Sequence, residues 1–165
     1  MQDEIASLTP GDYPTSCVSK VNLFLDDDFP ELMVLSQESG FSNVEFFRYD
    51  TTSKHWVSFY KNEPVDTNGG VESLMFLGIA NFTSDGREFL LIRSWAGSGG
   101  LLGFQIFGSK KHAFGKVVDE QNNGVPDGTF EIDASERKIN LSSGGDLAKT
   151  VTESNLDYTK MVIIP

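Results

Sequence analysis

Short apolar runs, rather than helical periodicity, dominate the hydrophobic pattern of this chain. The runs are rich in β-branched and aromatic residues and end at clusters of Gly, Asn, Asp and Ser, which is the pattern of strands separated by turns. In one run Leu102, Phe104 and Ile106 alternate with Gly103 and Gln105. This period of two places alternate side chains on opposite faces of a sheet. The pattern predicts an all-β fold.

Eight of these runs form two sets of four. We expect strands near residues 18–25, 31–37, 44–50 and 55–61, and again near 73–80, 88–95, 101–107 and 112–118. Strands that follow one another through short turns favour antiparallel meanders. The sequence therefore predicts two four-stranded, propeller-blade-like units, at 18–61 and 73–118, with polar, Gly-containing linkers after each unit.

The two units also resemble each other. Asp28–Leu35 and Asp85–Ile92 each lead from an acidic turn through Glu into an apolar strand. Lys54-His55 matches Lys111-His112 at the same offset of 57 residues. Features that recur in one order indicate an internal repeat; two similar hairpins in an unrelated β domain are the alternative.

Several strands are apolar on both faces, as Phe46-Phe47 and Trp56-Val57 show. Strands of this kind belong to sheets that are covered on both sides. We therefore expect the two units to pack as a sandwich or as a partial propeller, within a single β domain over residues 18–165 that follows an irregular arm at 1–17.

The C-terminal part, residues 128–165, is expected to be rich in strands. Its apolar runs are Thr129–Ile132, Lys138–Leu141 and Met161–Ile164. Asp146–Ser154 is expected to form a short helix.

The charge balance limits the classes of partner that this chain is expected to bind. The chain has 24 Asp and Glu against 13 Lys and Arg, a formal net charge of −11, whereas nucleic acids and anionic membranes attract clustered positive charge. No apolar run approaches the roughly 20 residues that span a bilayer. We expect no nucleic-acid partner and no membrane insertion.

The single cysteine, Cys17, excludes an intrachain disulfide and a cysteine-based metal cluster.

One turn has the pattern of a calcium loop. Asn81, Thr83 and Asp85 offer oxygen atoms at alternate positions, Gly86 permits a sharp bend, and Glu88 closes the set. With its flanking apolar runs, this segment resembles an FG-GAP or VCBS-type repeat, the blade unit of integrin-like β-propellers.

That resemblance implies calcium ligands at Asn81, Thr83, Asp85 and Glu88, and at Asp26 and Asp28 in the first unit. It also implies a location outside the cytoplasm: extracellular, at the cell surface, or periplasmic. Residues 1–5 are acidic and polar, unlike a signal peptide, which is compatible either with a cytoplasmic protein or with a secreted domain whose signal has been removed. The calcium affinity of such a sparsely charged loop is expected to be weak, with a Kd on the order of 10⁻⁴–10⁻³ M. In the alternative interpretation both segments are plain turns in which Asp and Asn cap backbone N–H groups.

A Gly-rich segment holds two candidate ligand-binding residues. Ser98 lies in Gly97-Ser98-Gly99, which is similar to a nucleophile elbow, but an elbow needs a following helix and the next run alternates like a strand. Trp95 precedes this loop, and loops at sheet ends are where binding residues gather.

His55 and His112 could join a carboxylate in a metal site, or lie on the surface at two separate strand starts.

These observations favour a non-catalytic binding or adhesion domain. The expected ligand is a protein or a carbohydrate, recognised by loops at one end of the sheets. One alternative is a hydrolase that uses Ser98 or the carboxylates of Asp85 and Glu88. Another is a structural protein whose edge strands complete a β assembly with a partner.

Overall fold

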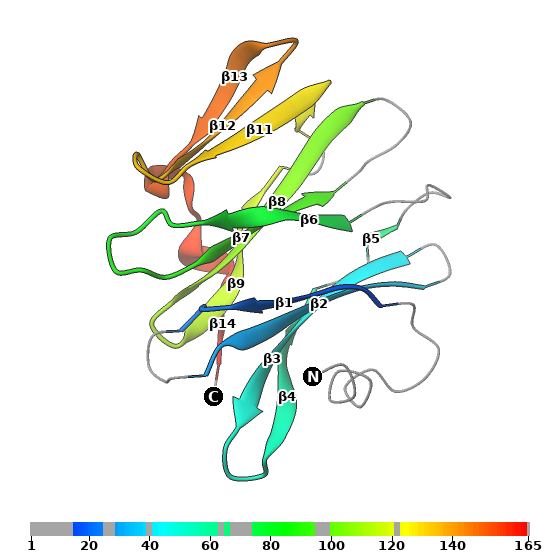
Figure 1. The fold of residues 1–165 in the computed structure, drawn as a ribbon, viewed down its shortest axis with the longest axis vertical. Coiled ribbons are helices and arrows are strands. Elements are labelled where there is room, and N and C mark those ends of the chain that lie inside the picture. Colours follow the sequence, from blue (N-terminus) through cyan, green and yellow to red (C-terminus); the bar gives the residue numbers. More distant parts are fainter. Residues whose placement is uncertain are drawn as a thin grey trace.

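Three antiparallel β-sheets lie in three layers in the computed structural model of this chain (Figure 1). The structure describes residues 15–24, 29–38, 41–62, 65–66, 74–94, 100–120 and 123–164. These residues form strands, turns and two short 3₁₀ helices, and none of them belongs to an α-helix. The predicted all-β fold class is confirmed.

The first two sheets contain the two predicted meanders. The first sheet has the order β1-β2-β3-β4, and its strands are β1 (Thr15–Val21), β2 (Glu31–Glu38), β3 (Phe41–Asp50) and β4 (His55–Lys61), with β5 (Val65–Asp66) beside β3. The second sheet has the order β14-β9-β8-β7-β6, and its strands are β6 (Leu74–Ala80), β7 (Phe89–Ser94), β8 (Leu101–Lys110), β9 (Ala113–Asp119) and β14 (Val162–Ile163), with β10 (Val125–Pro126) beside β8. Each four-stranded unit predicted from the sequence is present.

The third sheet follows along the chain. It has the order β11-β12-β13, and its strands are β11 (Gly128–Asp133), β12 (Lys138–Ser143) and β13 (Asp146–Val151). The 3₁₀ helices η1 (Glu153–Asn155) and η2 (Tyr158–Lys160) then lead the chain back to β14, at the edge of the second sheet.

The second sheet is the middle layer and is buried on both faces. Along β7 the side chains of Leu90 and Ile92 pack toward the first sheet, whereas Phe89 and Leu91 pack toward the third. All four side chains are fully buried. Strand alternation explains this division, because successive side chains point to opposite faces of a sheet.

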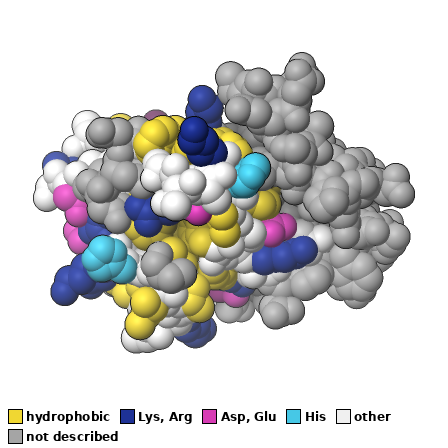
Figure 2. Space-filling view, turned by 90° about the horizontal axis from the view of Figure 1, so that it is seen from below, with side chains coloured by type: hydrophobic (Ala, Val, Ile, Leu, Met, Phe, Trp, Pro, Cys, Tyr) yellow, Lys and Arg dark blue, Asp and Glu magenta, His cyan; other side chains and the backbone are white. Residues whose placement is uncertain are grey.

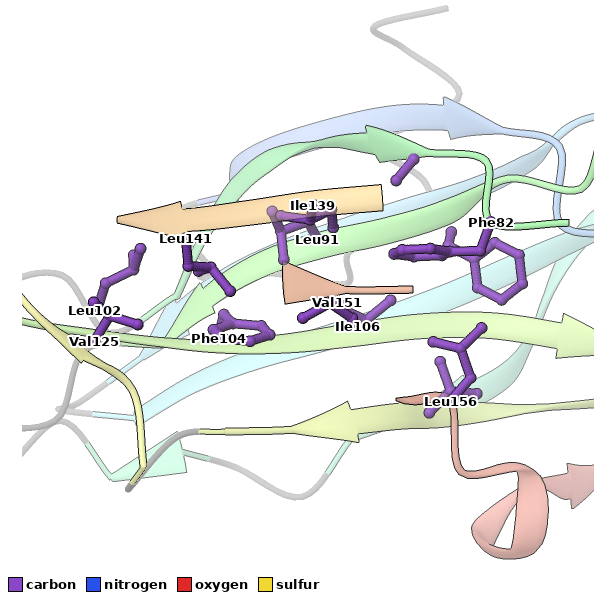
Figure 3. Packing of buried hydrophobic residues seen from close by; sticks show 13 residues of the cluster. Phe82, Leu91, Leu102, Phe104, Ile106, Val125, Ile139, Leu141, Val151 and Leu156 are labelled. Carbon is purple, nitrogen blue, oxygen red and sulfur yellow. The ribbon is translucent and has the colours of Figure 1, made fainter. Parts of the chain in front are cut away.

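Each interface between layers has its own hydrophobic core. The core between the first and second sheets contains a cluster of aromatic rings: Phe46 of β3 lies 4.7 Å from Phe114 of β9 and 5.5 Å from Phe107 of β8, measured between ring centroids. The core between the second and third sheets is mainly aliphatic (Figure 3), and includes Leu91, Ile106, Ile139, Leu141 and Val151. The second of these cores joins the C-terminal part of the chain to the predicted units.

The predicted helix over Asp146–Ser154 is wrong. Residues 146–151 form strand β13, which pairs with β12, and only 153–155 are helical, in a 3₁₀ turn. Gly144 and Gly145 both have positive φ, 58° and 93°. Two such residues make the tight turn that joins antiparallel strands. The residues that follow therefore form the second strand of a hairpin.

The first strand begins earlier than predicted. β1 starts at Thr15, so residues 15–17 of the predicted irregular arm belong to the first sheet, where Cys17 pairs with Leu35. The rest of that arm lies outside the described residues.

Candidate functional site

A pocket of about 470 Å³ lies at one end of the second sheet. It forms where the β6–β7 turn, the β8–β9 turn and the segment after β1 meet, and we refer to it as the turn pocket. Its lining residues are Phe24, Asp85, Arg87, Ser109, Lys110, Lys111 and His112. Figure 2 shows basic, histidine, acidic and apolar side chains distributed over the underside of the molecule.

Arg87 connects the three segments of the turn pocket. Its Nε donates to Asp85 Oδ2 at 2.7 Å, and its Nη1 donates to the backbone oxygen of Ser109 at 2.5 Å. The hydroxyl of Ser109 in turn donates to the backbone oxygen of Leu23. The guanidinium group is therefore held between the β6–β7 turn and the end of β8, with its side chain only 16% exposed.

Asp85 is held within its own turn. The Thr83 hydroxyl and the Arg87 N–H donate to Asp85 Oδ1, at 2.6 and 3.2 Å. Partial burial would raise the pKa of Asp85, but the hydrogen bonds from Thr83 and Arg87 outweigh it and hold that pKa below its ordinary value. Asp85 is therefore a carboxylate at neutral pH, with protein donors on both oxygens.

Two glutamates fix the segment after β1. Glu88 Oε2 accepts the Asn22 N–H at 2.7 Å, while the Glu88 N–H donates to the Asn22 backbone oxygen at 3.1 Å. Fully buried Glu31 accepts the Leu23 N–H at 2.9 Å. These bonds hold residues 22–24 beside the β6–β7 turn.

Three of the four predicted calcium ligands of the second unit thus have protein partners. Thr83 and Asp85 bond to each other, Glu88 binds backbone, and Asn81 is exposed. Within the described ranges, no group of three or more His, Cys, Asp or Glu side chains is arranged to hold a metal ion. Calcium binding stays a prediction for this turn.

Four of the predicted site residues lie outside the described residues. They are Asp26 and Asp28 of the first unit and Trp95 and Ser98 of the Gly-rich segment.

The β8–β9 turn supplies Lys110 and Lys111, which the sequence analysis did not place in a site, beside His112, which it considered only for a metal site. Lys110 Nζ lies 4.2 Å from the centre of the Tyr158 ring in η2, and burial raises the pKa of that tyrosine. Lys111 has a φ of 56°. The His112 backbone oxygen accepts the Ile164 N–H at 2.7 Å, so the C-terminal strand holds this turn. The consecutive basic residues Lys110, Lys111 and His112 were the available sequence signal.

A second pocket, of about 350 Å³, lies along β9 and the 3₁₀ helices. Two of its charged side chains are paired: Lys116 with Asp119 at 2.9 Å, and Glu120 with Lys149 at 2.5 Å. Asp157 and Lys160 also line this pocket, so its charges are mixed in sign, whereas cations predominate in the turn pocket.

Comparisons with known proteins leave the site to be interpreted from its own geometry. No family model matches this chain, and no curated protein or solved structure matches it. Among the described residues, no helix is both long and apolar enough to cross a membrane. The resemblance to FG-GAP repeats stays a prediction, and the turn pocket, the larger of the two pockets described above, is the candidate site.

Proposed function

We propose that this protein is a non-catalytic binding domain that recognises its ligand in the turn pocket. The observation that carries the proposal is a pocket of about 470 Å³ at the end of a sheet, lined by two turns and the segment after β1. Its volume falls within the range of roughly 300–1,000 Å³ that is typical of small-molecule sites.

The hydrogen bonds that hold the lining segments of the turn pocket in place favour a binding function. Arg87 bridges the two turns, Glu88 holds the segment after β1, and Ile164 N–H holds the β8–β9 turn. Loops held in this way on a buried sheet present side chains in fixed positions. A pre-formed pocket spends little free energy on ordering itself when a ligand arrives.

The chemistry of the pocket also favours binding over hydrolysis. Asp85 is the carboxylate among the lining residues, and both its oxygens accept protein hydrogen bonds. Its lowered pKa makes it a weak base, whereas a general base works best with a pKa near the operating pH.

A ligand screen read by nuclear magnetic resonance tests the proposal. We expect small molecules or short oligosaccharides to shift the amide signals of residues 83–88 and 109–112, without conversion of the ligand. Hits that shift only the signals of 116–120 would place the site in the second pocket. Release of a hydrolysis product would contradict the non-catalytic assignment.

A further inference from the structure

We propose that the ligand of the turn pocket is a small organic oxyanion, with a carboxylate, sulfate or phosphate group bound by Arg87, Lys110 and Lys111. This inference rests on the proposed function and adds the ligand's chemical class. The first argument is the contrast in charge. The whole chain carries a net charge of −11, whereas the lining of this pocket carries three cationic side chains and one carboxylate.

Arg87 is prepared for an anion. Its Nε and Nη1 bond to Asp85 and to the Ser109 backbone oxygen, and these bonds fix the plane of the guanidinium group. Neither of these two bonds uses Nη2. A fixed guanidinium with an available N–H edge is the donor that suits carboxylate and phosphate oxygens.

The two lysines keep their charge available. Among the described residues, neither Lys110 nor Lys111 forms a salt bridge, and both side chains are exposed. The ring of Tyr158 lies 4.2 Å from Lys110 Nζ. A cation–π contact orients an ammonium group without neutralising it, so Lys110 is positioned while its charge remains available to a ligand.

One aromatic side chain, Phe24, also lines the turn pocket. Phe24 is 5% exposed, and the guanidinium of Arg48 lies 5.2 Å from its ring centre. Its ring also packs against Phe59 and Phe114, so it contributes an apolar edge to the wall of the pocket. A volume of about 470 Å³ is far larger than an inorganic ion needs, and together with the cationic cluster it favours an organic anion.

The test is a titration at low ionic strength with glucuronate, glucose, inorganic phosphate and inorganic sulfate, read at the amides of residues 87 and 109–112. We expect glucuronate to bind more tightly than either inorganic ion, and glucose to bind at least tenfold more weakly. The response to phosphate or sulfate, relative to glucuronate, identifies which oxyanion the pocket prefers. Added salt should weaken binding because it screens exposed charges.

Lys111→Gln and Lys54→Gln form a matched pair of variants. Both lysines lie in hairpin turns with a φ near 57°, 56° for Lys111 and 58° for Lys54, but only Lys111 lines the turn pocket. Lys111→Gln should weaken glucuronate binding about threefold to tenfold, and Lys54→Gln should leave it unchanged. Equal weakening in both variants would indicate non-specific attraction and overturn the inference.

Two further outcomes separate the inference from the proposed function. Glucose binding in the pocket as tightly as glucuronate would overturn the oxyanion but retain the binding site, whereas failure of every probe and every screened compound would overturn both.

Asp26, Asp27 and Asp28 follow Phe24 closely in the sequence. If glucuronate bound only after all three were changed to Asn, the wild-type protein would not be an oxyanion receptor and the inference would fail.

Discussion

Gly108 is required by its contact with Phe89 across the middle sheet. A Cβ built at Gly108 would lie 2.2 Å from Phe89 Cδ1, far inside van der Waals contact, and both residues are buried. We predict that Gly108→Ala lowers the free energy of unfolding by about 1–3 kcal/mol, the usual cost of overfilling a packed core. Urea denaturation followed by circular dichroism measures the change.

Phe89→Leu provides the control for this prediction. A leucine frees part of the space of the ring, so Gly108→Ala should cost less in the Phe89→Leu background than in the wild type. Additive effects of the two substitutions would show that the ring is not the obstacle.

Gln105 is a polar side chain in an apolar setting. It is fully buried in β8, and within the described structure neither its Nε2 nor its Oε1 has a hydrogen-bond partner. An unpaired buried amide costs about 1–3 kcal/mol. Gln105→Met, which has a similar shape, should therefore raise the melting temperature. A lower melting temperature, measured by calorimetry, would show that the amide has a partner in solution, such as a buried water.

At the scale of elements, several turns are stabilised by hydrogen bonds that an aspartate side chain accepts. Asp133, at the end of β11, accepts the hydroxyl and the N–H of Ser135 and the N–H of Glu136. Similar bonds join Asp50 to Thr52 and Ser53, and Asp157 to Thr159. These bonds replace strand pairing where the chain reverses, because an Asp side chain can satisfy nearby backbone donors.

These turns make stability depend on pH. Hydrogen bonds from the Ser135 hydroxyl and the Glu136 N–H hold the pKa of Asp133 below its ordinary value of 3.8. Because the folded pKa is the lower one, this stabilisation is complete above the unfolded pKa and is lost as the pH falls through the folded pKa. We predict that Asp133→Asn lowers the melting temperature at pH 7 and flattens its fall below pH 3.8. Identical pH profiles for the variant and the wild type would contradict this.

The calcium prediction belongs to the β6–β7 turn. Asp85 already bonds to Arg87 and Thr83, so an ion must displace donors and should bind weakly, with a Kd of about 1 mM. Calcium at ten times that Kd should stabilise the protein by about 1.4 kcal/mol, and the melting temperature should rise by a few degrees. The rise should be absent in Asp85→Asn and in the presence of a chelator. An unchanged melting temperature in the wild type would leave this segment as a plain turn.

Local signals in the sequence predicted most elements and failed at one. Alternation in Leu101–Lys110 and the apolar run of Phe89–Ser94 correspond to β8 and β7. The helix predicted over 146–154 was wrong because the preceding Gly144-Gly145 pair, with positive φ at both residues, forms a hairpin turn after which residues 146–151 pair with β12.

At the scale of the whole molecule, the layers were predictable in part and the pocket was not. Apolar residues on both faces of a strand indicated a covered sheet. Nothing local, however, places residues 22–24 beside 83–88 and 109–112. That arrangement depends on pairing between strands and on bonds such as Asn22 N–H to Glu88, which join residues 66 positions apart. The basic residues of the pocket therefore looked like ordinary surface residues.

The shared middle sheet predicts how the molecule unfolds. Leu90 faces the core with the first sheet, and Leu91, its neighbour, faces the core with the third. A strand that belongs to both cores couples them, so we expect a single unfolding transition. Leu90→Ala and Leu91→Ala should each lower the free energy of unfolding by about 2–5 kcal/mol.

Hydrogen exchange distinguishes coupled layers from independent ones. If the layers are coupled, either variant should accelerate exchange in both β3 and β12, because opening the middle sheet exposes both cores. If Leu91→Ala accelerated exchange in β12 alone while β3 kept its protection, the third sheet would be a separate folding unit. The turn pocket would then depend on the first two sheets and on β14, and Leu91→Ala should leave its ligand affinity unchanged.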